Sequence, residues 1–240
     1  DHPALIGWTQ GIAGLVFGWN VVGLRAVVLL TLLGDLALFY LFAKRTSDPQ
    51  WSFWTTTTIF LATPILFGLT SVALPDHLMV FFTLAAVYCV ERLRHEPERV
   101  RWVYLGAVAA GFAMLSRYNS GVLAGALLAY VLIVPEMRRL FATPHLYLAV
   151  LLAVAMQTPV LVWNAQHGLA SFGFITGGRA RLPGSGLNIE GLRGYLVGGL
   201  SVLSPFIIWP LLRFGLTRHD GHGYARLVFD VARKILRDKG

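Results

Sequence analysis

The chain has 240 residues, of which 56% are hydrophobic and only 13% charged, and its formal net charge at pH 7 is +8. A soluble domain carries about 25% charged residues, so this composition cannot cover a water-facing surface and predicts an integral membrane protein. The basic residues stand in short clusters between apolar runs, which is typical of membrane topology and excludes a single basic face for nucleic acid. Cys89 is the single cysteine, which rules out an intramolecular disulfide and a cysteine-based metal site.

Apolar segments follow one another along the chain at lengths that suit a bilayer, where a spanning helix needs about 20 residues. The first segment, Ala4–Gly18, is shorter and is accompanied by Trp8, Gln10 and Trp19, so we expect a helix that lies in the membrane interface. Five later segments are predicted to span the membrane: Val21–Ala43, Phe53–Ala73, Asp76–Val90, His145–Trp163 and Leu192–Leu212.

The apolar stretch Trp102–Pro135 is interrupted by the polar residues Ser116–Gly121. One continuous helix would be about 51 Å long, too long for a hydrocarbon core of about 30 Å, whereas two passes of about 17 residues each are short but fit. Two passes also place most of the Lys and Arg residues on one side of the membrane, while a single pass divides them almost evenly. The positive-inside rule therefore favours two passes, which gives an all-α bundle of about seven spans plus the outer interfacial helix, with the basic loops in the cytoplasm.

The end of the chain differs in character from the rest. From about Gly215 it becomes polar, with four aliphatic residues between Leu227 and Ile235 at helical spacing, which predicts an amphipathic helix resting on anionic lipid. We therefore expect a partial transmembrane domain at residues 1–214 and a cytoplasmic amphipathic tail at residues 215–240. Within the bundle, the glycine spacing of Gly121–Gly125 predicts a close contact between helices.

On this topology, unusual polar residues gather on the outer face of the membrane. Ionisable groups at membrane depth are costly and indicate a functional site. Arginine and imidazolium groups suit a phosphate, so we predict a pocket for an anionic lipid-linked substrate. Asp1 and Asp76 could act as a general base or bind a metal ion or a sugar hydroxyl. The polar segments are Asp1–Pro3, Leu74–His77, Ser116–Ser120, Trp163–His167 and Ile175–Gly186.

These residues also have purely structural interpretations. Asp76 could cap the helix that begins beside it. Trp163 suits an interfacial aromatic belt whatever the function, and Arg117 could reach the head groups by snorkelling. His167 by itself is more often a hydrogen-bonded loop histidine than a ligand. Asp35, inside the first span, is expected to be protonated or hydrogen-bonded between helices rather than catalytic.

Four stretches carry a family resemblance: D-H-P-A-L-I-G-W followed by F-G-W-N-V-V-G-L-R; A-L-P-D-H-L-M-V-F-F; G-F-A-M-L-S-R-Y-N-S; and P-V-L-V-W-N-A-Q-H-G-L-A-S-F. In this order they resemble the dolichyl-phosphate-mannose–protein mannosyltransferase-like group, glycosyltransferase family 39, of bacterial inner membranes. They cover about residues 1–175. The resemblance implies a GT-C fold, a multi-pass helix bundle whose active site lies at the outer, periplasmic surface. It also implies a glycosyltransferase that uses a polyprenyl-phosphate sugar as donor.

The resemblance can be carried over position by position. Asp1 and His2 match the acidic–basic pair before the family's proline, and Asp76 matches the acid of its P-D motif. Arg117 matches the basic residue after G-x-x-x-L, and the outer-loop motif falls on Trp163–His167. The implied catalytic carboxylates are Asp1 and Asp76. The implied donor- and phosphate-binding residues are His2, Arg117, Trp163, Asn164, His167, Arg179 and Arg181, the last two by a looser alignment.

Two features of the family have no counterpart here: a helix before this point with an acidic motif just after it, and the later helices. We therefore expect a piece of a longer protein, with Asp1 as second choice for the base, which could be inactive by itself. The residues identify no cofactor, although a divalent cation stays open. The expected partners are a polyprenyl-phosphate-linked sugar and the bilayer, with no nucleic acid, while the sugar and the acceptor are not specified.

Two other classes of function are compatible with the composition. A transporter or flippase of a polar or lipid-linked solute would place polar residues through the midplane of the membrane. Asp35 and Gln157 fit that expectation, whereas most polar groups lie at one face. A non-catalytic membrane scaffold would tolerate substitution of the outer polar residues.

Overall fold

The structure is a computed structural model, and it describes residues 4–71, 73–173, 192–194 and 197–198. Regular structure in this part of the chain is entirely helical, as the composition predicts. The elements are α1 (Leu5–Phe17), α2 (Val21–Ala43), α3 (Pro49–Ala62), α4 (Pro64–Ser71), α5 (Pro75–His95), α6 (Arg101–Ser116), the 3₁₀ helix η1 (Tyr118–Ser120), α7 (Gly121–Ile133), the 3₁₀ helix η2 (Pro135–Ala142), α8 (Pro144–Ala155), α9 (Thr158–Gln166) and α10 (Ala170–Gly173).

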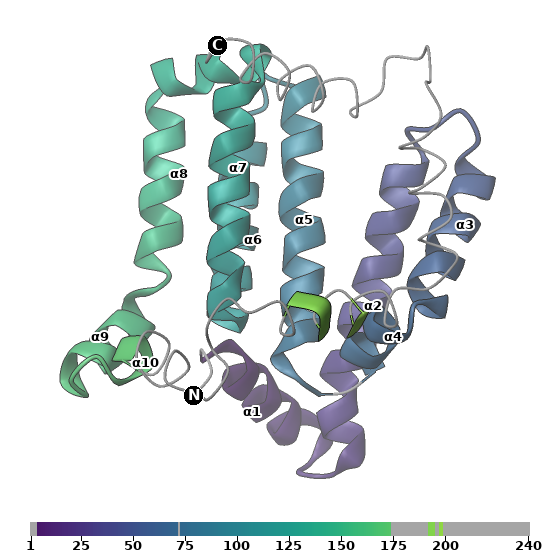
Figure 1. The fold of residues 1–240 in the computed structure, drawn as a ribbon, viewed down its shortest axis with the longest axis vertical. Coiled ribbons are helices and arrows are strands. Elements are labelled where there is room, and N and C mark those ends of the chain that lie inside the picture. The colour runs from purple at the N-terminus through teal and green to yellow at the C-terminus, as the bar shows by residue number, and fades with distance from the viewer. Residues whose placement is uncertain (1–3, 72, 174–191, 195–196, 199–240) are drawn as a thin grey trace.

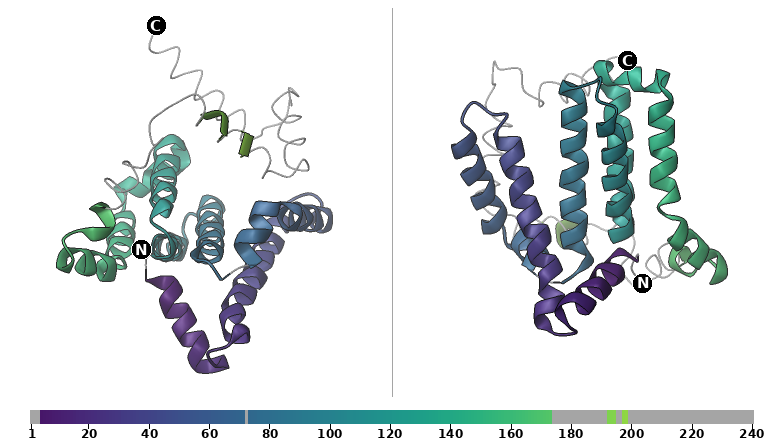
Figure 2. Two further views of the ribbon diagram at one scale, coloured as in Figure 1. Left: turned by 60° about the horizontal axis from the view of Figure 1, so that its bottom comes forward. Right: turned by 180° about the vertical axis from the view of Figure 1, so that it is seen from behind.

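The long helices α2, α5, α6, α7 and α8 run between two ends of a bundle (Figure 1). One end, which we call the rim end, contains α1, the start of α5, η1, α9 and α10. The views of Figure 2 show α1 crossing this end at an angle to the long helices. The α2–α3 connection, the α5–α6 connection and η2 lie at the other end, which we call the basic end. The stretch Trp102–Pro135 therefore forms two helices joined at the rim end, as its length predicts.

Among the described residues, α2 is the one helix long and apolar enough to cross a membrane by itself, with 23 residues and a mean hydropathy of 2.2. Its bounds are those predicted. Asn20 starts the helix because its Oδ1 accepts hydrogen bonds from the backbone N–H groups of Val22 and Gly23, at 2.9 and 3.0 Å. These are donors that a helix start leaves unpaired. Two bent helix pairs raise the number of candidate spans to at most three, so the predicted count of seven is not confirmed.

Proline interrupts two of the predicted spans. The segment Phe53–Ala73 forms α3 and α4, which meet at Thr63 with φ −85° and ψ 112°. Pro64 disfavours a helical backbone at the residue before it and offers no N–H, so the helix ends there. The segment His145–Trp163 forms α8 and α9, which are bent by 45° just before Pro159. The predicted span Leu192–Leu212, apart from a few residues, and the tail lie outside the described residues.

Glycine marks the closest approaches between helices. A β-carbon at Gly34 of α2 would overlap the ring of Phe81 in α5, and one at Gly111 of α6 would lie 2.6 Å from Sδ of Met156. By contrast, no atom of another described segment lies within 4 Å of a β-carbon built at either glycine of Gly121–Gly125. The predicted close contact is therefore not seen among the described residues. Small residues permit a close approach, but they do not bring a neighbouring helix to the site.

An apolar core at the basic end fixes the α5–α6 connection. Glu96, the C-cap residue of α5, contacts the guanidinium of Arg92 and accepts a hydrogen bond from Nε1 of Trp102 at 3.1 Å. The hydrogen bond from Arg92, and to a smaller extent that from Trp102, lowers the pKa of Glu96 below its usual value. The buried apolar residues nearby are Leu93, Val103, Val131, Val134, Met137, Leu140 and Ala149.

Candidate functional site at the rim end

The rim end joins two predicted site residues, Asp76 and Arg117, from different helices. Asp76 lies in the first turn of α5 and is 5% exposed, whereas Arg117 follows α6 and keeps 31% of its side chain exposed. Oδ1 of Asp76 accepts a hydrogen bond from Nη1 of Arg117. Leu74 is the N-cap of α5 and makes no side-chain capping bond, so the interpretation of Asp76 as that cap is wrong. A buried carboxylate instead anchors an arginine that reaches the surface.

His77, the next residue of α5, connects to α2. Its Nδ1 lies 3.0 Å from Oγ1 of Thr31, and both residues are buried. The hydroxyl oxygen of Thr31 also lies within hydrogen-bond distance of the backbone carbonyls of Val27 and Val28, at 3.1 and 2.9 Å. Nε2 of His77 is buried and has no hydrogen-bond partner among the described residues. The first turn of α5 is thus connected to α2 on one side and to the end of α6 on the other.

Asp35 lies one turn beyond Thr31 in α2 and is fully buried. Neither of its carboxylate oxygens has a hydrogen-bond partner within the part of the chain that the structure describes. A buried polar group without a partner costs free energy, so this carboxyl group is unusual in a helix interior. The expected hydrogen bond from Asp35 to another helix is not seen among these residues.

A second hydrogen-bonded chain links η1 to the end of α9. The hydroxyl of Tyr118 donates to Oγ of Ser171 at 3.2 Å. The backbone N–H of Ser171 donates to Oδ1 of Asn164 at 3.0 Å, and Nδ2 of Asn164 donates to the carbonyl of Val160 at 2.9 Å. Asn164 is completely buried and Ser171 is 1% exposed. The residue after Arg117 is therefore held by the predicted outer-loop motif.

The turn after α9 makes this connection possible. Gly168 and Leu169 both have positive φ, at 62° and 58°, which reverses the chain and brings Ser171 back to Asn164. His167 stacks on Trp163, with ring centroids 4.3 Å apart and an interplanar angle of 12°. Nδ1 of His167 donates to the carbonyl of Trp163 at 2.8 Å. Both side chains remain exposed, so the outer-loop motif has a buried amide and an exposed ring pair.

An apolar cluster supports the polar residues from behind. Leu5 of α1, Leu78 of α5 and Leu115 of α6 are buried against each other. Leu78 is two residues from Asp76, and Leu115 is two residues from Arg117. Val160, whose carbonyl holds Asn164, packs against the same cluster. Burial of these side chains therefore packs α1, α5 and α6 together, and Asp76 and Arg117 lie at the ends of α5 and α6.

The structure thus brings Asp76 and Arg117 into contact and places Trp163, Asn164 and His167 at the same end of the bundle. Asp1, His2, Arg179 and Arg181 lie outside the described residues. Thr31 and Ser171 were not predicted as site residues, although Ser171 belongs to the quoted stretch that ends at Phe172. Thr31 contacts His77, 46 residues away, and Ser171 contacts Tyr118, 53 residues away. No local sequence pattern predicts contacts between residues so far apart in the chain.

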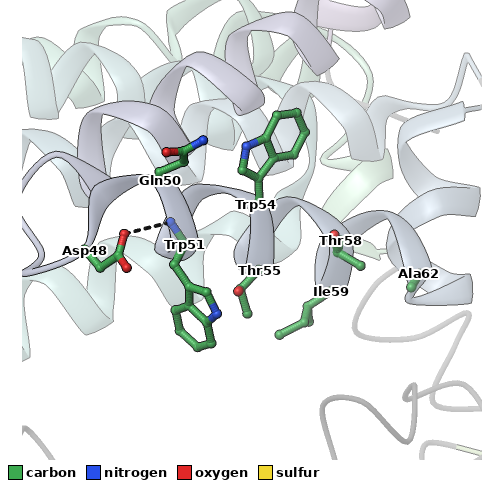
Figure 3. A pocket seen from close by; sticks show the side chains of 8 residues that line it. All are labelled: Asp48, Gln50, Trp51, Trp54, Thr55, Thr58, Ile59 and Ala62. Atoms are coloured by element: carbon green, nitrogen blue, oxygen red, sulfur yellow. Dashed lines mark hydrogen bonds between the residues drawn. The ribbon is translucent and has the colours of Figure 1, made fainter.

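Other candidate sites do not coincide with the rim end. A cavity of about 700 Å³ runs along the outer flank of α3, where Trp51 and Trp54 are 67% and 59% exposed (Figure 3). Its lining comes from residues 48–62 and includes none of the rim residues. Within the described residues no three His, Cys, Asp or Glu side chains converge to hold a metal ion. Asp1, one of the two carboxylates considered for a cation, lies outside this set.

Comparison with known proteins agrees with this helical membrane architecture. The family model described as dolichyl-phosphate-mannose-protein mannosyltransferase matches residues 1–163. The chain belongs to this family of membrane glycosyltransferases of the GT-C type, and the family resemblance predicted from the four sequence stretches is confirmed. No curated protein and no solved structure matches the chain.

Proposed function

We propose that the protein transfers a sugar from a polyprenyl-phosphate donor to an acceptor hydroxyl at the outer face of the bacterial inner membrane. The rim end is the proposed active site. The proposed acceptor is a hydroxyl group of a protein, a lipid or a glycan.

The observation that carries the proposal is the pairing of a buried Asp76 with a partly exposed Arg117. A guanidinium has five N–H donors in a fixed fork, and the contact with Oδ1 of Asp76 uses Nη1. The other donors suit the oxygens of a phosphate, and arginine binds phosphate in this bidentate manner. Because Asp76 restrains the side chain, Arg117 is already ordered before the ligand arrives, which reduces the entropic cost of binding.

In the proposed reaction, the acceptor oxygen attacks the anomeric carbon while the bond between that carbon and the phosphate oxygen breaks. The electron pair of the broken bond leaves with the polyprenyl phosphate, whose charge Arg117 stabilises. The proton of the acceptor hydroxyl passes to a carboxylate, for which Asp76 and Asp1 are the candidates. The developing positive charge on the sugar ring is typical of glycosyl transfer.

The remaining predicted residues, apart from Asn164, are proposed to contact the donor. Trp163 and His167 form an exposed stacked pair at the same end as Arg117, and flat ring faces suit the apolar face of a sugar. His2, Arg179 and Arg181 are proposed as further phosphate contacts. Asn164 belongs to this end of the bundle, where its side chain is engaged by backbone groups.

The distribution of charge supports the proposed orientation. Lys44, Arg45, Arg138 and Arg139 lie in the connections of the basic end, while Arg117 lies at the rim end. Cytoplasmic loops carry the excess of Lys and Arg, so the basic end is proposed to face the cytoplasm. The rim end would then face the periplasm.

A transporter or flippase is the second candidate function, and buried polar groups favour it. Asp35 and His77 are fully buried ionisable residues near the α2–α5 contact, each with atoms that lack partners among the described residues. Ionisable residues inside a membrane bundle often mark a substrate pathway. This function predicts that Asp35→Asn reduces movement of a lipid-linked sugar across vesicles, whereas a glycosyltransferase would show no such movement in either form.

The test is photo-crosslinking of the detergent-purified chain with a polyprenyl-phosphate probe, with unlabelled polyprenyl phosphate as competitor. We expect competed labelling that Arg117→Ala reduces at least tenfold, since a charge-assisted hydrogen bond contributes about 1.5–3 kcal/mol. Arg138→Ala is the matched control, because it removes an exposed arginine that also makes one hydrogen bond, to the carbonyl of Leu132. Labelling that unlabelled polyprenyl phosphate does not reduce would overturn the proposal. An equal loss of labelling in Arg117→Ala and Arg138→Ala would overturn it as well.

A further inference from the structure

The residue that follows Arg117 is tied to a part of the chain that lies 53 residues away. Tyr118 begins η1, and its hydroxyl donates to Oγ of Ser171 at 3.2 Å. Ser171 is 1% exposed, so this hydroxyl oxygen is shielded from competing solvent. The contact joins η1 to α10 across the rim end.

The partner of Tyr118 is itself held in place. Oδ1 of Asn164 accepts a hydrogen bond from the backbone N–H of Ser171 at 3.0 Å, and Nδ2 of Asn164 donates to the carbonyl of Val160 at 2.9 Å. Its side chain is therefore fixed at both polar ends, and the residue is completely buried. A side-chain amide held in this way sets the position of Ser171 relative to α9.

The backbone at Arg117 lies between two helical elements, and its own hydrogen bonds are local. Arg117 has extended backbone angles, φ −151° and ψ 139°, between the end of α6 and η1. Its N–H donates to Ala113 at 3.1 Å, and its carbonyl accepts from Ser120 at 3.0 Å, both of which are local contacts. Among the described residues, the long-range polar contacts of this segment include the ion pair of Arg117 with Asp76 and the hydrogen bond of Tyr118 with Ser171. The first fixes the guanidinium, and the second fixes the backbone from which it extends.

We propose that Tyr118, Ser171 and Asn164 form a positioning relay that holds Arg117 at the geometry required to bind the phosphate of a polyprenyl-phosphate ligand. This inference rests on the proposed function and assigns its phosphate site a set of supporting residues. None of the three relay residues needs to contact the ligand. The outer-loop motif, in this view, acts on the phosphate through η1 and Arg117.

The inference explains why an amide and a small hydroxyl residue stand seven positions apart around Gly168. The positive-φ turn at Gly168 and Leu169 returns the chain, so that Ser171 can face both Asn164 and Tyr118. A displacement of about 1 Å at a binding group is enough to weaken a bound geometry strongly. A hydrogen bond that holds the backbone beside Arg117 therefore affects ligand affinity without touching the ligand.

The test measures the dissociation constant of polyprenyl phosphate by competition against the photoprobe for the wild-type chain, Tyr118→Phe, Ser171→Ala and the double variant. One neutral hydrogen bond corresponds to about a two- to tenfold change in an equilibrium constant. We expect each single variant to raise the dissociation constant by about three- to tenfold. Because both variants remove the same bond, the double variant is expected to be no weaker than the single ones.

Tyr147→Phe is the matched control, because the hydroxyl of Tyr147 also makes one hydrogen bond, to the carbonyl of Phe141 at 2.9 Å in the other half of the bundle. It should leave the dissociation constant unchanged. A merely structural effect would lower the thermal midpoint and the amount of protein that binds, while the affinity of the remaining protein would stay the same. The relay predicts the opposite, a changed affinity with unchanged binding capacity.

The two proposals fail in different ways. If the wild-type chain shows no competed binding, the proposed function is overturned and the role of the relay in phosphate binding falls with it. If the wild-type chain binds polyprenyl phosphate, and Tyr118→Phe and Ser171→Ala bind it with the same affinity as the wild type, only the relay is overturned. Additive losses in the double variant would also contradict it.

Discussion

Asp76 and His77, consecutive residues in the first turn of α5, are bound to two different helices: Asp76 to Arg117 at the end of α6, and His77 to Thr31 of α2. Neighbouring helix residues lie about 100° apart around the axis, so one turn can contact two partners. The start of α5 is therefore the point at which three helices are fixed relative to one another.

The pair of Asp76 and Arg117 is expected to stabilise the fold. Asp76→Asn keeps the shape of the side chain and removes its charge, so the partly buried guanidinium loses its ion pair. We expect a loss of about 1–3 kcal/mol in the free energy of unfolding, seen as a lower thermal midpoint in detergent. In a double-mutant cycle with Arg117→Gln, the two losses should not add. Strict additivity would show that the pair does not form.

Asp35 is expected to destabilise the bundle. Both of its oxygens are buried without partners in the described part of the chain, and such groups cost about 1–3 kcal/mol. The nearly isosteric Asp35→Asn and the apolar Asp35→Leu should therefore raise the thermal midpoint or leave it unchanged. A lower midpoint for Asp35→Asn would contradict this and would reveal a partner for the carboxyl group.

Glycine at position 23 is expected to be required by packing. A β-carbon there would overlap the carbonyl oxygen of Gly18, which belongs to the backbone and cannot rotate away. Gly23→Ala should destabilise the protein by about 1–3 kcal/mol. Gly125→Ala is the matched control in another helix, where no other described segment lies within 4 Å of the added β-carbon. It should be neutral or stabilising because alanine favours helix. Thermal unfolding of the two variants side by side tests the difference.

The stability contribution of Glu96 is expected to depend on pH. Its pKa is lowered in the folded state by its bonds to Arg92 and Trp102, so its contribution is present above the unfolded-state pKa and is lost as pH falls through the folded-state pKa. Glu96→Gln should therefore lower the thermal midpoint at pH 7, and the difference from wild type should shrink below about pH 4. Glu98→Gln, an exposed neighbour, is the control. If the difference in thermal midpoint between Glu96→Gln and wild type stays constant with pH, the stability contribution does not come from the charged carboxylate of Glu96.

The arrangement of α6, η1 and α7 predicts a specific accessibility pattern. Asn119 in η1 and Glu136 in η2 are exposed and lie at opposite ends of the bundle. In a Cys89→Ser background, Asn119→Cys and Glu136→Cys should react with a membrane-impermeant thiol reagent from opposite sides of oriented vesicles. Labelling of both from one side would contradict the two-pass arrangement of residues 101–133.

Local features of the fold could be predicted because they depend on neighbouring residues. The bounds of α2 follow from a long apolar run that begins after Asn20, an amide that satisfies the first free N–H groups. The break between α6 and α7 follows from a polar interruption in a stretch too long for one span. The segment Phe53–Ala73, expected as one continuous span, is divided into two helices because Pro64 ends the first helix at Thr63.

The sequence by itself determined that the chain is helical, that it belongs in a membrane and that its polar residues concentrate in a few segments. Only the tertiary structure decided which of these segments meet. Asp76 with Arg117, and Tyr118 with Ser171, are separated by 41 and 53 residues, so no local pattern encodes their contact. Those contacts depend on which helices pack together, and that choice rests on side-chain fit, such as the space left for Phe81 at Gly34.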